Sequence, residues 1–368
     1  MLTEYFNSDL ENFFTQLKRH NRERLLEEAP TDALDLSSND YLCLSKHPHL
    51  IAALHAGIDL YGAGSTASRL VRGHREVFLR LENKMAEWLG GEAALFFANG
   101  YAANVGVLSA VCDGSYAAFI DRLAHASLVD GVRLSGAQKV YFRHNDTEHL
   151  REQLLKRPAK KRIIISESVF SMDGDRAPLG ELVRLAQEFD ALLYIDDAHA
   201  TGVFGPAGRG LAPVTADFRV STFGKALGLE GAVIVTNARV RRYLIHNART
   251  FVFSTAPLPA VAYAGLTAIG LAQQMEKERS QLQANAQLLR EGLLRLGYQV
   301  GKSTTQIVPL YLSSEQHALA VAAQLLREGF HAKAIRPPTV KESRIRFSLN
   351  TGVRAEDIAR LLKALAKV

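Results

Sequence analysis

The sequence has few cysteines and no long run of one charge. Cys43 and Cys112 are its two cysteines and show no CxxC spacing, so neither a disulfide framework nor a zinc or other metal site is expected. The 44 basic and 38 acidic residues leave a net charge of only +6. The most basic stretch, KRPAKKR at 156–162, precedes an apolar run and is interpreted as a solvated turn, so no nucleic-acid partner is expected.

Long apolar runs and a basic leader are also missing. The first residues, MLTEYFNSDLENFF, carry acids where a signal peptide carries bases. The longest apolar window, Leu258–Ala272, is rich in alanine and glycine and is predicted to be a packed helix that does not span a membrane. With 368 residues, 47% apolar and 22% charged, the composition is typical of a soluble enzyme, and we expect a cytoplasmic one.

The order of apolar and amphipathic segments predicts an α/β protein. Between about 51 and 256, short apolar runs such as RIIISES, ALLYIDD and GAVIVT alternate with segments of helical length. Such alternation predicts a mostly parallel sheet with helices on both faces. We expect residues 1–45 to form an N-terminal helical arm, in which LENFFTQLKRHNRERLLEE has helical spacing. Residues 46–260 are predicted to be a large domain and residues 261–368 a smaller C-terminal α+β domain.

Polar side chains follow four of the predicted strands at the points where these strands end. They are Asp121 and His125, then Ser168 and Ser171, then Asp196, Asp197 and His199, then Thr222 and Lys225. Ligands of parallel α/β sheets gather at the carboxyl ends of strands. Alone, such an aspartate would be a helix cap or turn residue and such a lysine a surface residue. Together they favour a site, because buried charges need one another.

One cofactor chemistry, that of pyridoxal 5'-phosphate (PLP), uses this set of side chains. A lysine amine forms a Schiff base with the aldehyde of the cofactor, and burial helps by lowering the pKa of the amine. A carboxylate beside the pyridine nitrogen keeps the ring an electron sink. A helix N-terminus holds the phosphate, and Asn99–Gly100–Tyr101 lies between a predicted strand and an alanine-rich helix.

A dinucleotide-binding site is the rival interpretation. GAGSTA, residues 62–67, fits the GxGxxA pattern, and Glu82 follows at about the expected spacing. The context is wrong, since the preceding HLIAALHAGIDLY is predicted to be a helix where this motif needs a strand. We therefore reject a nicotinamide cofactor.

With these residues in place, the chain resembles the α-oxoamine synthases, which are fold-type I PLP-dependent transferases. The resemblance covers nearly the whole chain in ordered blocks: LDLSSNDYLCLSKHP, YGAGSTASRLVRGH, FFANGYAAN, DRLAHASLVDGVRLS, SVFSMDGDRAPL, YIDDAHATGVFG, TFGKALG, AIRPPTV and RIRFSL. DRLAHASL and AIRPPTV are more similar to the members that serve biotin synthesis than to their glycine-using relatives.

The resemblance implies a role for each residue around PLP. Lys225 would be the Schiff-base lysine and the base that removes the Cα proton, Asp196 would pair with the pyridinium nitrogen, and His125 would stack on the ring. His199 would hydrogen-bond the phenolic oxygen. The other implied cofactor contacts are Gly100, Tyr101 and Thr222 at the phosphate, Ser171 near the ring, and Thr255, which would reach the phosphate of a second subunit. The resemblance thus implies a homodimer with its active site at the interface.

The resemblance also implies the substrates. L-alanine would condense with pimeloyl-CoA, or with a pimeloyl group on an acyl carrier protein, with loss of CO2. Asn39 and Arg346 would lie at the amino-acid carboxylate, and Ser68 stands where glycine-specific members carry threonine. Thr66, Ala67, Cys43 and Ala200 depart from positions where family members have glycine.

Three kinds of alternative stay open at this point. A related synthase would use glycine or serine, and an aminotransferase or aldolase on the same fold would release no CoA. A PLP-fold regulator or a CoA-binding module would show no catalytic turnover.

Overall fold

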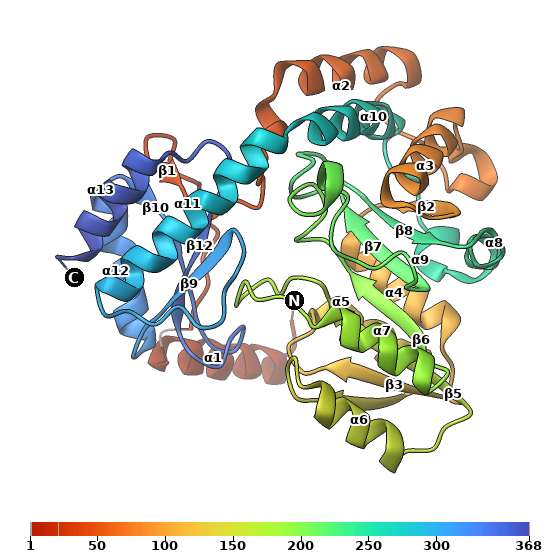
Figure 1. Cartoon of the computed structure of the whole chain (residues 1–368), viewed down its shortest axis with the longest axis horizontal. Coiled ribbons are helices and arrows are strands. Elements are labelled where there is room, and N and C mark those ends of the chain that lie inside the picture. Colours follow the sequence, from red (N-terminus) through yellow and green to blue (C-terminus); the bar gives the residue numbers. More distant parts are fainter. Residues whose placement is uncertain (1, 21, 368) are drawn as a thin grey trace.

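The computed structural model describes residues 2–20 and 22–367 and centres on a seven-stranded sheet (Figure 1). The strand order is β2-β8-β7-β6-β5-β3-β4. The strands are β2 (Ala93–Phe97), β3 (Tyr116–Asp121), β4 (Gln138–Phe142), β5 (Lys161–Glu167), β6 (Leu192–Asp196), β7 (Phe218–Thr222) and β8 (Ala232–Thr236). β8 runs in the direction opposite to that of the other six strands of this sheet. The predicted α/β fold with a mostly parallel sheet is confirmed.

Helices cover both faces of this sheet, which explains why its strands are apolar along nearly their whole length. One face packs against α4 (Gly100–Val111), α5 (Ala126–Ser135), α8 (Ala238–Asn247) and α9 (Arg249–Val252). The other face packs against α6 (Thr147–Lys156) and α7 (Leu179–Glu188) at one end, and against α3 (Glu76–Leu89) and α10 (Pro259–Gln274) at the other. α10 also packs on α2 (Pro48–Tyr61). The apolar window around α10 is therefore a packed helix, and none of the described helices is long and apolar enough to cross a bilayer.

The C-terminal third forms a smaller antiparallel sheet of order β11-β12-β9. Its strands are β9 (Ile307–Tyr311), β11 (Lys333–Ile335) and β12 (Arg344–Ser348), and its helices are α11 (Glu276–Arg295), α12 (Glu315–Arg327) and α13 (Ala355–Leu365). The short strand β1 (Leu34–Asp35) pairs with β10 (Phe330–His331). This pairing ties residues 34–35 to the C-terminal part, while the domain boundaries at 45 and 260 stay a prediction.

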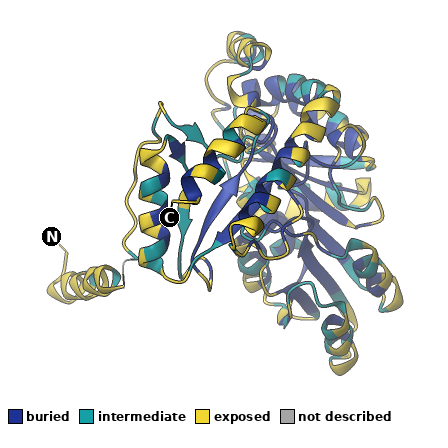
Figure 2. Ribbon diagram, turned by 60° about the vertical axis from the view of Figure 1, so that its left-hand side comes forward, coloured by how far each residue is buried: buried dark blue, intermediate teal, exposed yellow. Residues whose placement is uncertain are grey.

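The N-terminal helix is shorter than its spacing predicts. α1 covers Glu4–Arg19 and stands clear of the body of the chain (Figure 2), whereas residues 22–30 carry no helix. The prediction of a helix through residue 28 was therefore wrong. Long-range contacts replace it: Arg22 pairs with Glu315 on α12 at 2.9 Å, and Glu27 pairs with Lys333 on β11. These tertiary contacts outweigh a helical propensity of a few tenths of a kcal/mol per residue.

Candidate active site

The four polar strand ends lie next to one another, because β7, β6, β5 and β3 are consecutive in the sheet. A cavity of about 190 Å³ opens at this edge. It brings together seven residues of the predicted site: Gly100, Tyr101, His125, Asp196, His199, Thr222 and Lys225. Asn104, Ser127 and Glu167 also line it, and the sequence analysis did not single them out.

Lys225 is held in a turn just after β7. The Thr222 hydroxyl donates to the Gly231 carbonyl at 3.1 Å and accepts the Gly224 N–H at 3.1 Å, which fixes the start of this turn. Gly228 ends the turn with φ +66°, and a side chain there would meet the backbone of Ser45 at 2.3 Å. Burial lowers the pKa of Lys225 to about 8, against the opposing charges of Asp196 and Glu167. The amine is thereby brought close to its neutral, nucleophilic form.

Asp196 ends β6, and its buried carboxylate accepts one hydrogen bond on each oxygen. Its Oδ2 accepts from the Asn104 amide at 2.7 Å, and its Oδ1 accepts from the Ala198 N–H at 3.0 Å. Asn104 is fixed in turn by the Tyr194 hydroxyl, which donates to its Oδ1 at 2.8 Å. The sequence does hold a signal for Asn104, since it is a polar residue inside the apolar helix GYAANVGVLSAV.

The neighbouring Asp197 serves the fold. Its carboxylate accepts from the backbone N–H groups of Leu211 and Ala212, at 3.2 and 3.0 Å. It therefore anchors the loop that follows β6, outside the 190 Å³ cavity.

The two histidines approach the cavity in different ways. His199 is buried and its Nδ1 lies 2.6 Å from the Tyr41 hydroxyl, and burial lowers its pKa well below the usual value, which keeps the ring neutral. His125 caps α5, leaves its ring open to the cavity, and donates its backbone N–H to Glu167 at 2.7 Å. Burial also lowers the pKa of His125, which favours a neutral ring that can stack on another ring. Tyr41 was not among the predicted site residues.

The predicted carboxylate-binding residues form a second cluster beside the cavity. The Arg346 guanidinium donates to Asn39 Oδ1 at 3.1 Å and to the Ser171 carbonyl. The Tyr41 hydroxyl contacts Asn39 Oδ1 at 3.2 Å and so links this cluster to His199. Asn39, Ser171 and Arg346 thus lie together, although none of them lines the 190 Å³ cavity.

Ser68 and Thr255 lie apart from both groups. The Ala256 N–H donates to the Ala67 carbonyl at 3.0 Å, so their two segments run side by side. Thr255 is exposed and Ser68 is half-buried, and neither lines the cavity.

The residues present fit PLP. α4 starts at Gly100 and points its N-terminus into the cavity, where the backbone N–H groups of Gly100 and Tyr101 have no partner among the described residues. Nothing lies within 4 Å of the place where a Cβ of Gly100 would stand. A phosphate suits such a helix N-terminus, and Lys225 and Asp196 supply the amine and the carboxylate that the rest of the cofactor needs.

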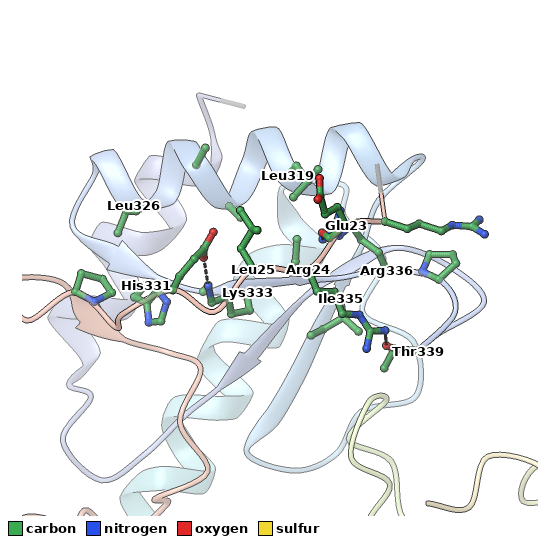
Figure 3. Close-up of a pocket in the computed structure, with 18 of the residues that line it drawn as sticks. Glu23, Arg24, Leu25, Leu319, Leu326, His331, Lys333, Ile335, Arg336 and Thr339 are labelled. Atoms are coloured by element: carbon green, nitrogen blue, oxygen red, sulfur yellow. Dashed lines mark hydrogen bonds and ion pairs between the residues drawn. The ribbon is translucent and has the colours of Figure 1, made fainter. Parts of the chain in front are cut away.

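A larger cavity of about 780 Å³ (Figure 3) has no lining residue in common with the 190 Å³ cavity. Residues 22–30 form one wall of it, and α12, β10 and β11 form the others. Side chains on opposite walls of this cavity contact one another: Lys333 forms an ion pair with Glu27, and Arg24 donates to the Thr339 hydroxyl at 2.8 Å. This cavity has no lysine beside a buried carboxylate and is not the candidate active site.

Comparison with known proteins identifies the family of this chain. Residues 31–365 match the family described as aminotransferase class I and II. The chain belongs to this family. It is also 43% identical to the 8-amino-7-oxononanoate synthase of Geobacter metallireducens, over 92% of this chain and 89% of the relative.

Two solved structures share the fold. The serine palmitoyltransferase of S. paucimobilis, with bound PLP–myriocin aldimine, has a TM-score of 0.92 at 26% identity and covers 98% of this chain and 97% of its own. The 8-amino-7-oxononanoate synthase of Francisella tularensis has a TM-score of 0.80 at 27% identity and covers 92% and 98%. The predictions of a fold-type I PLP-dependent acyltransferase and of PLP as cofactor are thus confirmed.

Proposed function

We propose that this enzyme condenses L-alanine with a pimeloyl thioester, of CoA or of a carrier protein, and forms 8-amino-7-oxononanoate and CO2 for biotin synthesis. The observation that carries the proposal is the meeting of Lys225, Asp196 and two histidines at one sheet edge, beside a free helix N-terminus. The name of the relative at 43% identity supports the choice of substrates.

Each side chain of the site has a task in this reaction. Bound PLP supplies an aldehyde that captures the amino acid and a ring that accepts its electrons. The Lys225 amine takes the Cα proton of alanine, Asp196 balances the positive charge on the ring nitrogen, and His125 packs on the ring face. Arg346 and Asn39 bind the alanine carboxylate, for which a guanidinium fork is well suited.

We further propose that the working unit is a homodimer. Thr255 is exposed, and neither it nor Ser68 reaches the cavity of its own chain. A second copy that brings Thr255 to the phosphate end would complete the site and keep Ser68 close to it, since the two segments are joined by a backbone hydrogen bond.

The test is to mix the purified enzyme with pimeloyl-CoA and one amino acid at a time, and to follow both free thiol and product mass. We expect release of CoA with L-alanine, a product of the mass of 8-amino-7-oxononanoate, and far less turnover with glycine or L-serine. Amino transfer to a keto acid without release of CoA would instead indicate an aminotransferase.

A serine-using synthase is the second candidate, because the PLP-bound serine palmitoyltransferase superposes over 98% of this chain. Serine would then give the larger CoA release, and long-chain acyl-CoA would outperform pimeloyl-CoA. The same assay with palmitoyl-CoA separates the two candidates.

A further inference from the structure

Two carboxyl groups stand side by side in the cofactor cavity. Glu167 ends β5 and Asp196 ends β6, and the two residues are register partners in the parallel sheet. Neighbouring strands lie about 4.8 Å apart, and partners in register point to the same face. Both side chains line the 190 Å³ cavity and are nearly buried, with exposures of 4% for Glu167 and 7% for Asp196.

No lysine or arginine forms an ion pair with either carboxyl within the described part of the chain. This distinguishes Glu167 from Glu82, which is just as buried but pairs with Arg69 and Arg241. Two adjacent buried carboxylates without such partners repel each other, and one of them then keeps its proton.

The hydrogen bonds decide which of the two holds this proton. Asp196 accepts one hydrogen bond on each oxygen, from Asn104 and from the Ala198 N–H, and both bonds stabilise its charged form. Glu167 accepts a single bond on Oε1, from the His125 N–H, and its Oε2 has no partner among the described residues. The proton therefore belongs on Oε2 of Glu167.

We propose that Glu167 is a positioning residue that works as the neutral acid: it leaves Asp196 as the single carboxylate facing the cofactor ring nitrogen, and it orients His125 through the backbone N–H. The inference concerns the cofactor cavity and holds for any amino-acid substrate of the enzyme.

The electrostatic surroundings of Glu167 agree. The groups that face it are Asp196 on β6, Asp121 on β3, Lys225 after β7 and the His125 N–H on α5. Burial, followed by the charge of Asp196, raises the pKa of Glu167 well above its usual value, and Lys225 and the His125 hydrogen bond only partly offset this.

Infrared spectroscopy of the holoenzyme tests the proton directly. We expect the wild type minus Glu167→Gln difference spectrum to show the carbonyl stretch of a protonated carboxylic acid. The control Glu82→Gln alters an ion-paired glutamate of similar burial, and its difference spectrum should lack this band. A difference spectrum is needed because burial also raises the pKa of Asp197, to about 7. A wild type minus Glu167→Gln spectrum without the band would overturn the proposal.

Titration of PLP into the full-length enzyme stripped of cofactor tests the positioning role. Glutamine copies the neutral acid and keeps an acceptor for the His125 N–H, so Glu167→Gln should stay within about 3-fold of the wild-type Kd, whereas Glu167→Leu should weaken PLP about 10-fold or more. The visible circular dichroism of bound PLP, which reports the packing around its ring, should be preserved in Gln and altered in Leu.

An equal loss in Glu167→Gln and Glu167→Leu would show that the negative charge itself is needed, and would overturn the proposal. If Glu167→Leu fails to fold, the glutamine variant and the infrared band still decide. The assay of amino-acid preference is a separate experiment, so its failure would leave this result untouched.

Discussion

The predicted site divides into two halves that are built in opposite ways. The cofactor half consists of Gly100, Tyr101, His125, Asp196, His199, Thr222 and Lys225, which line one cavity. These residues lie at or shortly after the ends of four strands of a single sheet, β2, β3, β6 and β7. The substrate half consists of Asn39, Ser68 and Arg346, which come from distant parts of the chain and lie outside that cavity. The predicted cofactor contacts Ser171 and Thr255 also lie outside the cavity.

The difference shows how much of a site one sheet can supply. The cofactor half is fixed by the sheet, because strands that run in the same direction have their carboxyl ends at the same edge. The substrate half needs β12 to bring Arg346 to Asn39, which lies more than 300 positions earlier. In the proposed homodimer, a second copy would bring Ser68 close to the cavity. We therefore expect substitutions in the cofactor half to change the visible spectrum of bound PLP. Substitutions in the substrate half should leave that spectrum unchanged.

The largest effect is expected from Lys225→Ala. The variant loses both the amine that holds PLP and the base that takes the Cα proton, and turnover should fall about 10⁴-fold or more. Its visible spectrum should lack the protein-bound aldehyde band, while its thermal unfolding stays near that of the wild type. Turnover within tenfold of the wild type would remove Lys225 from the mechanism.

Asp196→Asn should keep the fold and lose most activity, by roughly 10²–10³-fold. The amide has nearly the shape of the carboxylate but cannot balance a positive ring nitrogen. The spectrum of bound PLP should change together with kcat, as expected of the cofactor half. Near-wild-type turnover would sink this role for Asp196.

Arg346→Lys should separate the halves. Lysine keeps the charge but loses the two-pronged contact to a carboxylate, so KM for alanine should rise about 10- to 100-fold, the worth of one or two charged hydrogen bonds. The PLP spectrum without amino acid should stay that of the wild type. A PLP spectrum that changed together with KM would show that Arg346 also affects the cofactor, and that the two halves act as a single unit.

The pH dependence of PLP binding tests the pKa of Lys225 in the cofactor half. The pKa of Lys225 is lowered to about 8, so its amine is protonated and unreactive below that pH and neutral above it. Capture of PLP by the stripped enzyme should therefore slow about 5-fold from pH 8 to pH 7 and level off above pH 9. A stopped-flow trace of the forming absorbance band gives the rate, and a flat profile would contradict the assignment of this pKa.

Most of the fold could be predicted from the sequence, because every long strand of the large sheet is an apolar run bounded by turns. The segment at 22–28 was the exception. Its spacing is helical, but its charged side chains are used by partners such as Glu315 and Lys333, which lie about 300 positions away. The periodicity of a short segment cannot predict contacts with residues so distant in the sequence.

The residues of the cofactor half could be predicted from the ends of the apolar strands. The residues that hold them in place could not. Tyr41 and Asn104 act through buried hydrogen bonds to His199 and Asp196 from an N-terminal loop and a helix. Glu167 lies in the strand-end segment IIISES, yet its position beside Asp196 follows from the register of β5 and β6, which a sequence does not state.

Ser68→Thr should have the smallest effect, and it tests whether Ser68 contributes to the preference for alanine over glycine. The added methyl group would crowd that of alanine and leave glycine unaffected, so kcat/KM for alanine relative to glycine should fall about 5-fold, or about 1 kcal/mol. The same variant tests the dimer, because Ser68 does not reach the cavity of its own chain. In a hybrid dimer with one Lys225→Ala chain, the working cavity is that of the chain that keeps Lys225. The altered preference should then appear only when Ser68→Thr is carried by the Lys225→Ala chain. An unchanged ratio in every combination would place Ser68 outside the site and leave the preference for alanine to other residues.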